Sequence, residues 1–160
     1  MFRFNKDKST SSFLRKINKL SKKYSKSLEQ KQFIEVEHKD GPGMGALLSY
    51  SNTHLTIRLI NDRNQLFIDI HPNHNSKETF SLAFLISMIK LYSSKKEFAE
   101  LSKKEKYALY EINCDLNDPF DLFFKYYDDI ITILSEDHYA KTRKELNNFF
   151  KERGKWLFPN

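Results

Sequence analysis

The stretch from Gly45 to Leu91 most constrains how this chain can fold. Its first part reads as three strands on tight turns, and its second part reads as a helix that is apolar nearly all round. In the strand runs, apolar residues alternate with a period of two, the pattern of a sheet with one buried face. A helix without a polar side has to lie in the interior. The stretch therefore predicts a sheet covered by helices.

Two turns predict the register of these strands. A two-residue loop at positions 52–53 would place Leu48 opposite Ile57, and a turn around positions 63–64 would place Leu59 opposite Ile68. For the second turn we expect a four-residue loop over 62–65, because arginine at 63 does not favour the positive φ of a two-residue turn. Both turns put the same apolar side chains on one face.

The opposite face is mixed. In the expected register Arg58 lies opposite Asp69, and Ile60 lies opposite Phe67. One interpretation is a solvated face with a cross-strand ion pair and a cross-strand apolar pair. A second interpretation is a partner-binding face, on which Leu47, Ile60 and Phe67 form an exposed apolar patch. The N-terminal helix is a further candidate to cover these apolar side chains.

Periodicity along the rest of the chain predicts an α+β fold. We expect an N-terminal helix, a four-stranded antiparallel meander and then three to four helices packed on one sheet face. Residues 1–160 should form a single domain, with residues 1–12 frayed. Asp118, followed by proline, should cap a helix, and Gly154 should end the last one. The expected helices cover about 12–30, 77–92, 97–112, 118–134 and 136–152, and the first strand covers 32–37.

Charge is unevenly distributed along the chain. The net charge is +6, but residues 1–31 hold ten Lys/Arg against two Asp/Glu, while residues 32–160 hold 17 against 19. The basic side chains lie on a helix that also carries an apolar stripe. They either keep a docked amphipathic helix soluble or bind phosphate backbones of nucleic acid or anionic lipid. The six basic residues in question are Arg15, Lys16, Lys19, Lys22, Lys23 and Lys26.

Several classes of function lack support in the sequence. No apolar run approaches the ~20 residues that span a bilayer, and the N-terminus has no apolar signal core. Cys114 is the only cysteine, which fits a reducing cytosol, so we expect a cytoplasmic protein. No phosphate-binding loop or nucleophile constellation is present, and we expect neither catalysis nor a cofactor. Asp69, His71 and His74 could ligate a metal, but we favour solvent-exposed histidines there and predict no metal site.

Acidic pairs mark a possible second contact surface. Asp128 and Asp129 are adjacent on an expected helix, and Tyr126, Tyr127 and Tyr139 border the acidic stripe. Adjacent helix positions point in different directions, so the pair cannot be assigned as general acid and base. A solvated acidic stripe is the simpler interpretation, although such a stripe also attracts a basic partner.

The expected hairpin over residues 55–72 resembles small bacterial immunity proteins of polymorphic toxin and contact-dependent growth inhibition systems. The residues that carry the resemblance are Asn61-Asp62-Arg63-x-Gln65 at the turn and Phe67-x-Asp69-Ile70 on the return strand. The resemblance implies a stoichiometric inhibitor, without catalysis or cofactor, that binds a cognate toxin domain tightly in the cytosol.

Two surfaces are our hypotheses for the contact with such a partner. The first is the outer sheet face with its turn, and the second is the acidic helix stripe. The alternative function is a nucleic-acid-binding or ribosome-associated module that uses the basic N-terminal helix. The residues of the first surface are Arg58, Asp62, Arg63, Phe67 and Asp69, and those of the second are Asp128 and Asp129.

Overall fold

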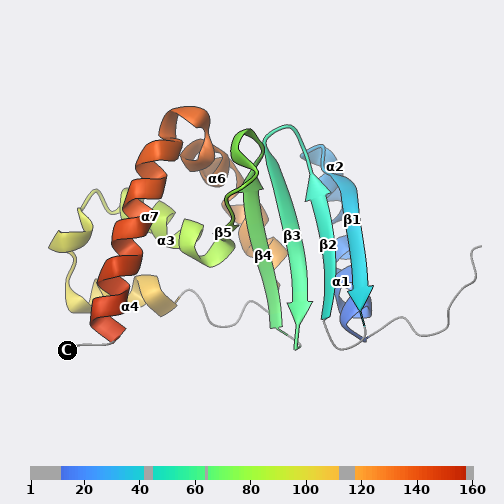
Figure 1. Cartoon of the computed structure of the whole chain (residues 1–160), viewed down its shortest axis with the longest axis horizontal. Coiled ribbons are helices and arrows are strands. Elements are labelled where there is room, and N and C mark those ends of the chain that lie inside the picture. Colours follow the sequence, from blue (N-terminus) through green and yellow to red (C-terminus); the bar gives the residue numbers. More distant parts are fainter. Residues whose placement is uncertain (1–11, 42–44, 64, 112–117, 158–160) are drawn as a thin grey trace, which may run out of the picture.

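The structure, a computed structural model, describes residues 12–41, 45–63, 65–111 and 118–157. It confirms the α+β class: N-terminal helices, then an antiparallel meander, then several helices (Figure 1). The sheet order is β1-β2-β3-β4-β5. The strands are β1 (Ile34–Gly41), β2 (Gly45–Ser51), β3 (Leu55–Asp62), β4 (Gln65–Pro72) and β5 (Phe80–Ser81). The helices are α1 (Ser12–Lys23), α2 (Ser25–Gln30), α3 (Leu82–Ser93), α4 (Lys103–Glu111), α5 (Pro119–Lys125), α6 (Tyr127–Leu134) and α7 (Glu136–Leu157), with 3₁₀ turns η1 (Asn73–Asn75) and η2 (Phe98–Glu100).

The fifth strand corrects the expected four-stranded sheet. Sequence periodicity predicts that residues 77–81 begin a helix, but Phe80 pairs with Ile70 and Ser81 pairs with Asp69. The free edge of β4 offers backbone donors and acceptors, and this short strand satisfies part of them. Helix α3 therefore begins only at Leu82.

The β3–β4 register is as predicted, and the loop between the strands is not. Leu59 pairs with Ile68, but Asp62 pairs with Gln65, which leaves a two-residue turn instead of the expected four-residue loop. Arg63 adopts the left-handed φ of +49° that this turn requires. The tertiary pairing of the two strands therefore overrides the local preference of arginine.

The β2–β3 register differs from the prediction by two residues. Leu48 pairs with Leu59 rather than with Ile57. The Asn52 side chain explains the longer loop, because its Oδ1 accepts the backbone N–H groups of His54 and Leu55, each at 2.9 Å. A shift of two keeps every side chain on its predicted face.

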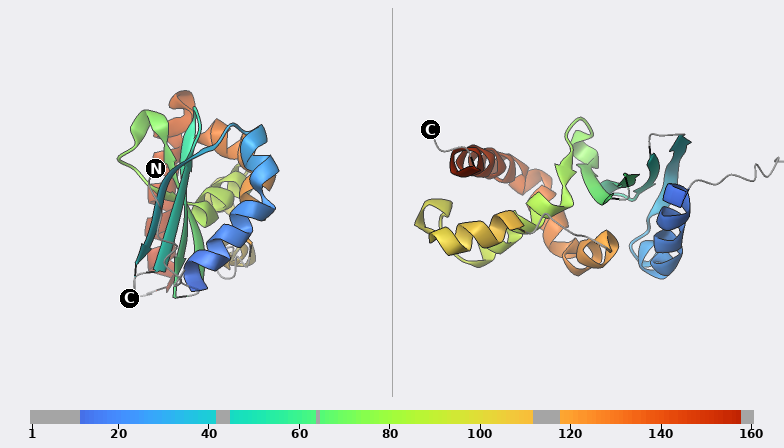
Figure 2. Two further views of the ribbon diagram at one scale, coloured as in Figure 1. Left: turned by 90° about the vertical axis from the view of Figure 1, so that its right-hand side faces the viewer. Right: turned by 90° about the horizontal axis from the view of Figure 1, so that it is seen from below.

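One face of the sheet, which we call the inner face, carries the core. Ile57, Leu59 and Ile70 have no exposed surface there. Helix α1 packs on β2 and β3, while α3 and α5 pack on β4, so the helices lie on this side of the sheet (Figure 2). The helices expected on this face after the sheet are joined there by α1, which covers its β2–β3 half. The amide of Asn61 fixes α1 there by donating to the carbonyl of Phe13 at 3.1 Å.

Asp118 joins the N-terminal helices to α5. As predicted it is the N-cap, and its side chain accepts the backbone N–H of Asp121 at 3.3 Å. Its Oδ2 also accepts from Lys23 Nζ and from the Tyr24 hydroxyl, the latter at 2.8 Å. Burial alone would raise the pKa of this carboxyl, but the two hydrogen bonds outweigh it and hold the pKa below the usual 3.8.

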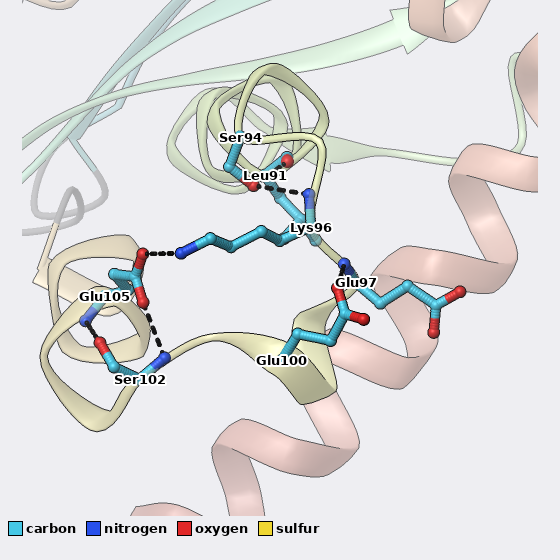
Figure 3. A network of polar contacts seen from close by, with 7 residues as sticks. All are labelled: Leu91, Ser94, Lys96, Glu97, Glu100, Ser102 and Glu105. Atoms are coloured by element: carbon cyan, nitrogen blue, oxygen red, sulfur yellow. Dashed lines mark hydrogen bonds and ion pairs between the residues drawn. The ribbon is translucent and has the colours of Figure 1, made fainter.

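The long helix expected over 97–112 is divided into the turn η2 and the helix α4. Polar contacts hold the segment that leads from α3 into α4 (Figure 3). Helix α4 begins with a capping box, in which Glu105 accepts from the Ser102 N–H at 2.7 Å and Ser102 Oγ accepts from the Glu105 N–H at 3.3 Å. Lys96 also donates to Glu105, at 2.7 Å. The hydrogen bonds from Lys96 and Ser102 lower the pKa of Glu105 to about 2.

Other boundaries also differ from the prediction. The helices expected over 12–30 and 118–134 are each divided, at Tyr24 and at Tyr126. Helix α7 continues through Gly154 and ends at Leu157, so Gly154 is not a helix stop. Cys114 and residues 1–11 lie outside the described part of the chain, and Ser12, included in the expected frayed segment, begins α1.

We expect Gly45 and Gly154 to respond in opposite ways to alanine. Gly45 has a φ of +80°, and a Cβ atom there would collide with the carbonyl oxygen of Asn61. Gly45→Ala should therefore cost about 2 kcal/mol or more of unfolding free energy. Gly154 lies in α7, and a Cβ atom added there would have no neighbour within 4 Å, so Gly154→Ala should gain up to about 1 kcal/mol. Urea unfolding measures both, and a neutral Gly45→Ala would contradict the close approach of Gly45 to the Asn61 carbonyl.

We expect substitutions of Asp118 to separate its two roles. Asp118→Ala removes both the cap and the ion pair and should cost about 1–2 kcal/mol at pH 7. Asp118→Asn keeps a capping oxygen but loses the charge, so it should cost less. Because the folded-state pKa is lowered, the wild-type advantage over Asp118→Asn should be present above pH 3.8 and be lost as the pH falls through the folded value. Urea unfolding at pH 7 and at pH 3 tests this, and equal stability of wild type and Asp118→Asn at pH 7 would rule out a contribution from the charge.

Candidate protein-binding surface

The second face of the sheet, which we call the outer face, lies away from the helices that cover the core. In Figure 1 strands β1–β4 stand in front, with α1 and α2 behind them, and the edge-on view of Figure 2 places α1 and α3 on one side only. The outer face is therefore free of a covering helix within the part of the chain that the structure describes. The expectation that the N-terminal helix could cover it is wrong, because α1 packs on the inner face.

An apolar row crosses the outer face. Leu47 pairs with Ile60, which pairs in turn with Phe67, and Lys39 of β1 continues the row beside Leu47. Leu47 and Ile60 are half-buried, whereas Phe67 is 42% exposed. The three apolar side chains therefore lie together as expected, but only Phe67, at the β4 end, is exposed.

A polar row runs parallel to the apolar one. Its members pair in order from β1 to β5, namely Glu37, Ser49, Arg58, Asp69 and Ser81. Ser49 is only 1% exposed, and its hydroxyl donates to Glu37 at 3.3 Å. Glu37 also pairs with Lys39 on the same strand. The polar side chains at the β1 end of this row thus have hydrogen-bond and ion-pair partners within the protein.

The centre of the polar row is not satisfied. Arg58 lies opposite Asp69 as predicted, but the expected ion pair does not form within 4.0 Å, and neither side chain has a hydrogen bond to any described residue. The Nε of Arg58 is buried without a partner. Burial raises the pKa of Asp69, and the nearby charges of His71 and Arg58 offset only part of that rise. Asp69 is therefore a partly buried carboxylate without a hydrogen-bonding or ion-pair partner among the described residues.

The two histidines near Asp69 face different groups. His71 is 6% exposed, and its Nδ1 shares a hydrogen bond with the Thr79 hydroxyl at 3.2 Å. Burial, together with the charge of Arg58, lowers the pKa of His71. His74 instead donates from Nε2 to the carbonyl of Leu134 at 2.6 Å. The expectation of exposed histidines is thus wrong for His71, and no group of three metal-ligating side chains occurs among the described residues.

The structure separates the two hypothesised surfaces. Asp62 lies at the turn end of the outer face and Arg63 lies in the turn itself, so both adjoin the apolar row. Asp128 and Asp129 lie in the first turn of α6, in the helical layer. Asp128 accepts from Lys31 Nζ at 3.1 Å and is thereby paired within the protein.

Asp129 lies in a different setting from Asp128. It borders a cavity of about 390 Å³ between α3, α6 and α7, which Tyr92, His138 and Lys141 also line. Together the two aspartates place negative charge at the N-terminus of α6, where it stabilises the helix. This structural role accounts for the acidic stripe.

Sequence reasoning missed part of the outer face. Because it ended the first strand at Glu37, it did not place Lys39 beside Leu47, whereas β1 continues to Gly41. The bulge between Glu35 and Glu37 interrupts the alternation on which such a prediction depends. The alternation places His71 on this face, but its burial is not predicted by the sequence.

Comparison with known proteins yields no relative, since no family model, curated protein or solved structure matches this chain. Among the described residues, no helix combines the length and the apolar character that crossing a bilayer requires.

We expect Asp69→Asn to stabilise the isolated protein at pH 7. Because the pKa of Asp69 is raised in the folded state, the free energy of unfolding of the wild type falls as the pH rises from 3.8 through the folded-state pKa. The asparagine amide does not ionise, so the variant does not lose this stability. The gain should be on the order of 0.5 kcal/mol at pH 7 and should vanish at pH 3, where the carboxyl is protonated in both states. Urea unfolding at both pH values measures the difference. Asp62→Asn, an exposed control on the same face, should be neutral, and a destabilised Asp69→Asn at pH 7 would mean that Asp69 has a stabilising partner.

Proposed function

We propose that this protein is a non-catalytic, cytoplasmic binding protein, an immunity protein that neutralises a cognate toxin domain by stoichiometric binding through its outer face. One observation carries the proposal. Arg58 and Asp69 lie opposite each other at the centre of an uncovered sheet face, yet neither has a bonded partner among the described residues. Desolvated charges without partners are costly, and they recur where a ligand or another protein completes them.

The surroundings of the two charges fit a protein partner. A binding surface usually combines an apolar or aromatic anchor with a few polar groups that orient the partner. Here Phe67 is the exposed anchor, and Arg58 is a residue type that interfaces favour. A toxin domain that buries Phe67 would also desolvate Arg58 and Asp69 and would supply an acceptor for one and a donor for the other.

The hairpin that resembles immunity proteins forms this same surface. Within its Phe67-x-Asp69-Ile70 segment, Phe67 and Asp69 belong to the two outer rows, while Ile70 is buried on the inner face. The turn residues Asp62 and Arg63 lie at the edge of the outer face. The resemblance and the unpartnered charges therefore support one binding surface.

Co-expression with the toxin domain encoded by the adjacent gene tests the proposal. We expect a 1:1 complex and loss of toxin activity. Phe67→Ala and Arg58→Ala should each weaken binding at least about tenfold, in the range of interface hot spots, without lowering the melting temperature. Asp69→Asn should also weaken binding although it stabilises the free protein. Titration calorimetry measures the affinities.

Tyr107→Ala is the matched control for Phe67→Ala. Tyr107 is 47% exposed, close to Phe67 at 42%, but it lies on α4, away from the outer face. Its truncation should leave toxin binding unchanged. The proposal fails if no complex forms with the adjacent-gene toxin domain, or if the outer-face variants bind as tightly as the Tyr107 variant.

A further inference from the structure

A row of cations follows the solvent side of the N-terminal helices. Arg15, Lys19, Lys22 and Lys26 are all exposed, and they recur at intervals of four, three and four residues. Backbone bonds from the N–H of Tyr24 to Leu20 and from that of Leu28 to Tyr24 continue the helical pattern across the break between α1 and α2. The spacing therefore places the four side chains, which we call the basic row, on one side of the helix.

The basic row points away from the body of the protein. The buried residues of these helices are Leu14, Ile17 and Leu28. At about 100° per residue, the centre of the basic row lies roughly 145° from that of the buried stripe. Because α1 covers the inner face of the sheet, the row also lies on the opposite side of the sheet from the outer face.

The basic row is electrostatically unsatisfied. Two other cations of this segment are paired, Lys23 with Asp118 and Lys31 with Asp128. No residue of the basic row has an ion pair with a described carboxylate. Like charges at these spacings repel each other and weaken a helix. A polyanion that binds the row would remove that repulsion.

We propose that the basic row binds the phosphate backbone of nucleic acid, a function distinct from toxin binding by the outer face. The row extends over about 16 Å, given a rise of about 1.5 Å per residue, and meets several successive phosphates of one strand. The row itself contains no aromatic side chain, so binding is electrostatic and independent of base sequence. The apolar stripe is buried against the sheet, so the helix has no apolar side to insert into a bilayer.

Fluorescence anisotropy with a labelled 20-nucleotide single-stranded RNA, between 50 and 200 mM KCl, tests the proposal. The row variant carries Arg15→Gln, Lys19→Gln, Lys22→Gln and Lys26→Gln together. The control variant removes the same charge from exposed lysines of α3, α4 and α7, through Lys90→Gln, Lys104→Gln, Lys144→Gln and Lys151→Gln. Circular dichroism melts check that both variants fold, which we expect because every substituted side chain is exposed.

We expect the row variant to bind RNA more than about tenfold more weakly than wild type at 50 mM KCl. The slope of log affinity against log salt concentration should fall in magnitude by about 3. The control variant should stay within about twofold of the wild-type affinity. Equal losses in both variants would show a net-charge effect and overturn the proposal. Absence of RNA binding by wild type at 50 mM KCl, or tighter binding to anionic phosphatidylserine vesicles than to RNA, would overturn it as well. The row variant should still bind the toxin domain, so this proposal and the proposed function can fail separately.

Discussion

Burial of the inner sheet face is the interaction on which the rest of the structure depends. Leu48, Ile57, Leu59, Ile68 and Ile70 are each at most 2% exposed, and burying a side chain of this size contributes about 1.5–3 kcal/mol. Two helical units from opposite ends of the chain share the task, since α1 covers β2 and β3 while α3 and α5 cover β4. The contacts of Asp118 with Lys23 and Tyr24 join these two units.

Because the helices that pack on strands β2 to β4, namely α1, α3 and α5, lie on the inner side, the outer face does not carry the core. Two carboxylates, Glu105 of α4 and Asp69 of the outer face, show how the helical layer and the outer face differ. Glu105 accepts hydrogen bonds from Lys96 and Ser102, and its pKa is lowered to about 2, as in a group that serves the fold. Asp69 has no bonded partner among the described residues, and burial raises its pKa. We propose that such a group serves contact with a partner rather than the fold.

Local chemistry made some elements predictable. The Asp118 cap with proline after it could be identified because a helix cap involves only neighbouring residues. The β3–β4 register, including Arg58 opposite Asp69, followed from alternation and a short connection. The β2–β3 loop was longer than expected because the side chain of Asn52 binds two backbone amides, a contact that alternation does not encode. The strand β5 could not be predicted, since it exists only as a complement to the edge of β4.

The sequence by itself determined which side chains share a face of the sheet, because a period of two is a local property of an extended backbone and survives a shift of two residues. It likewise determined that the N-terminal helix has an apolar stripe on one side and cations on the other. Only the tertiary structure decided that α1 covers the inner face, and hence that Phe67, Arg58 and Asp69 lie on an uncovered surface. Which face α1 covers depends on packing between segments far apart in the chain. The apolar stripe of α1 could pack on either face, so the sequence alone does not decide it.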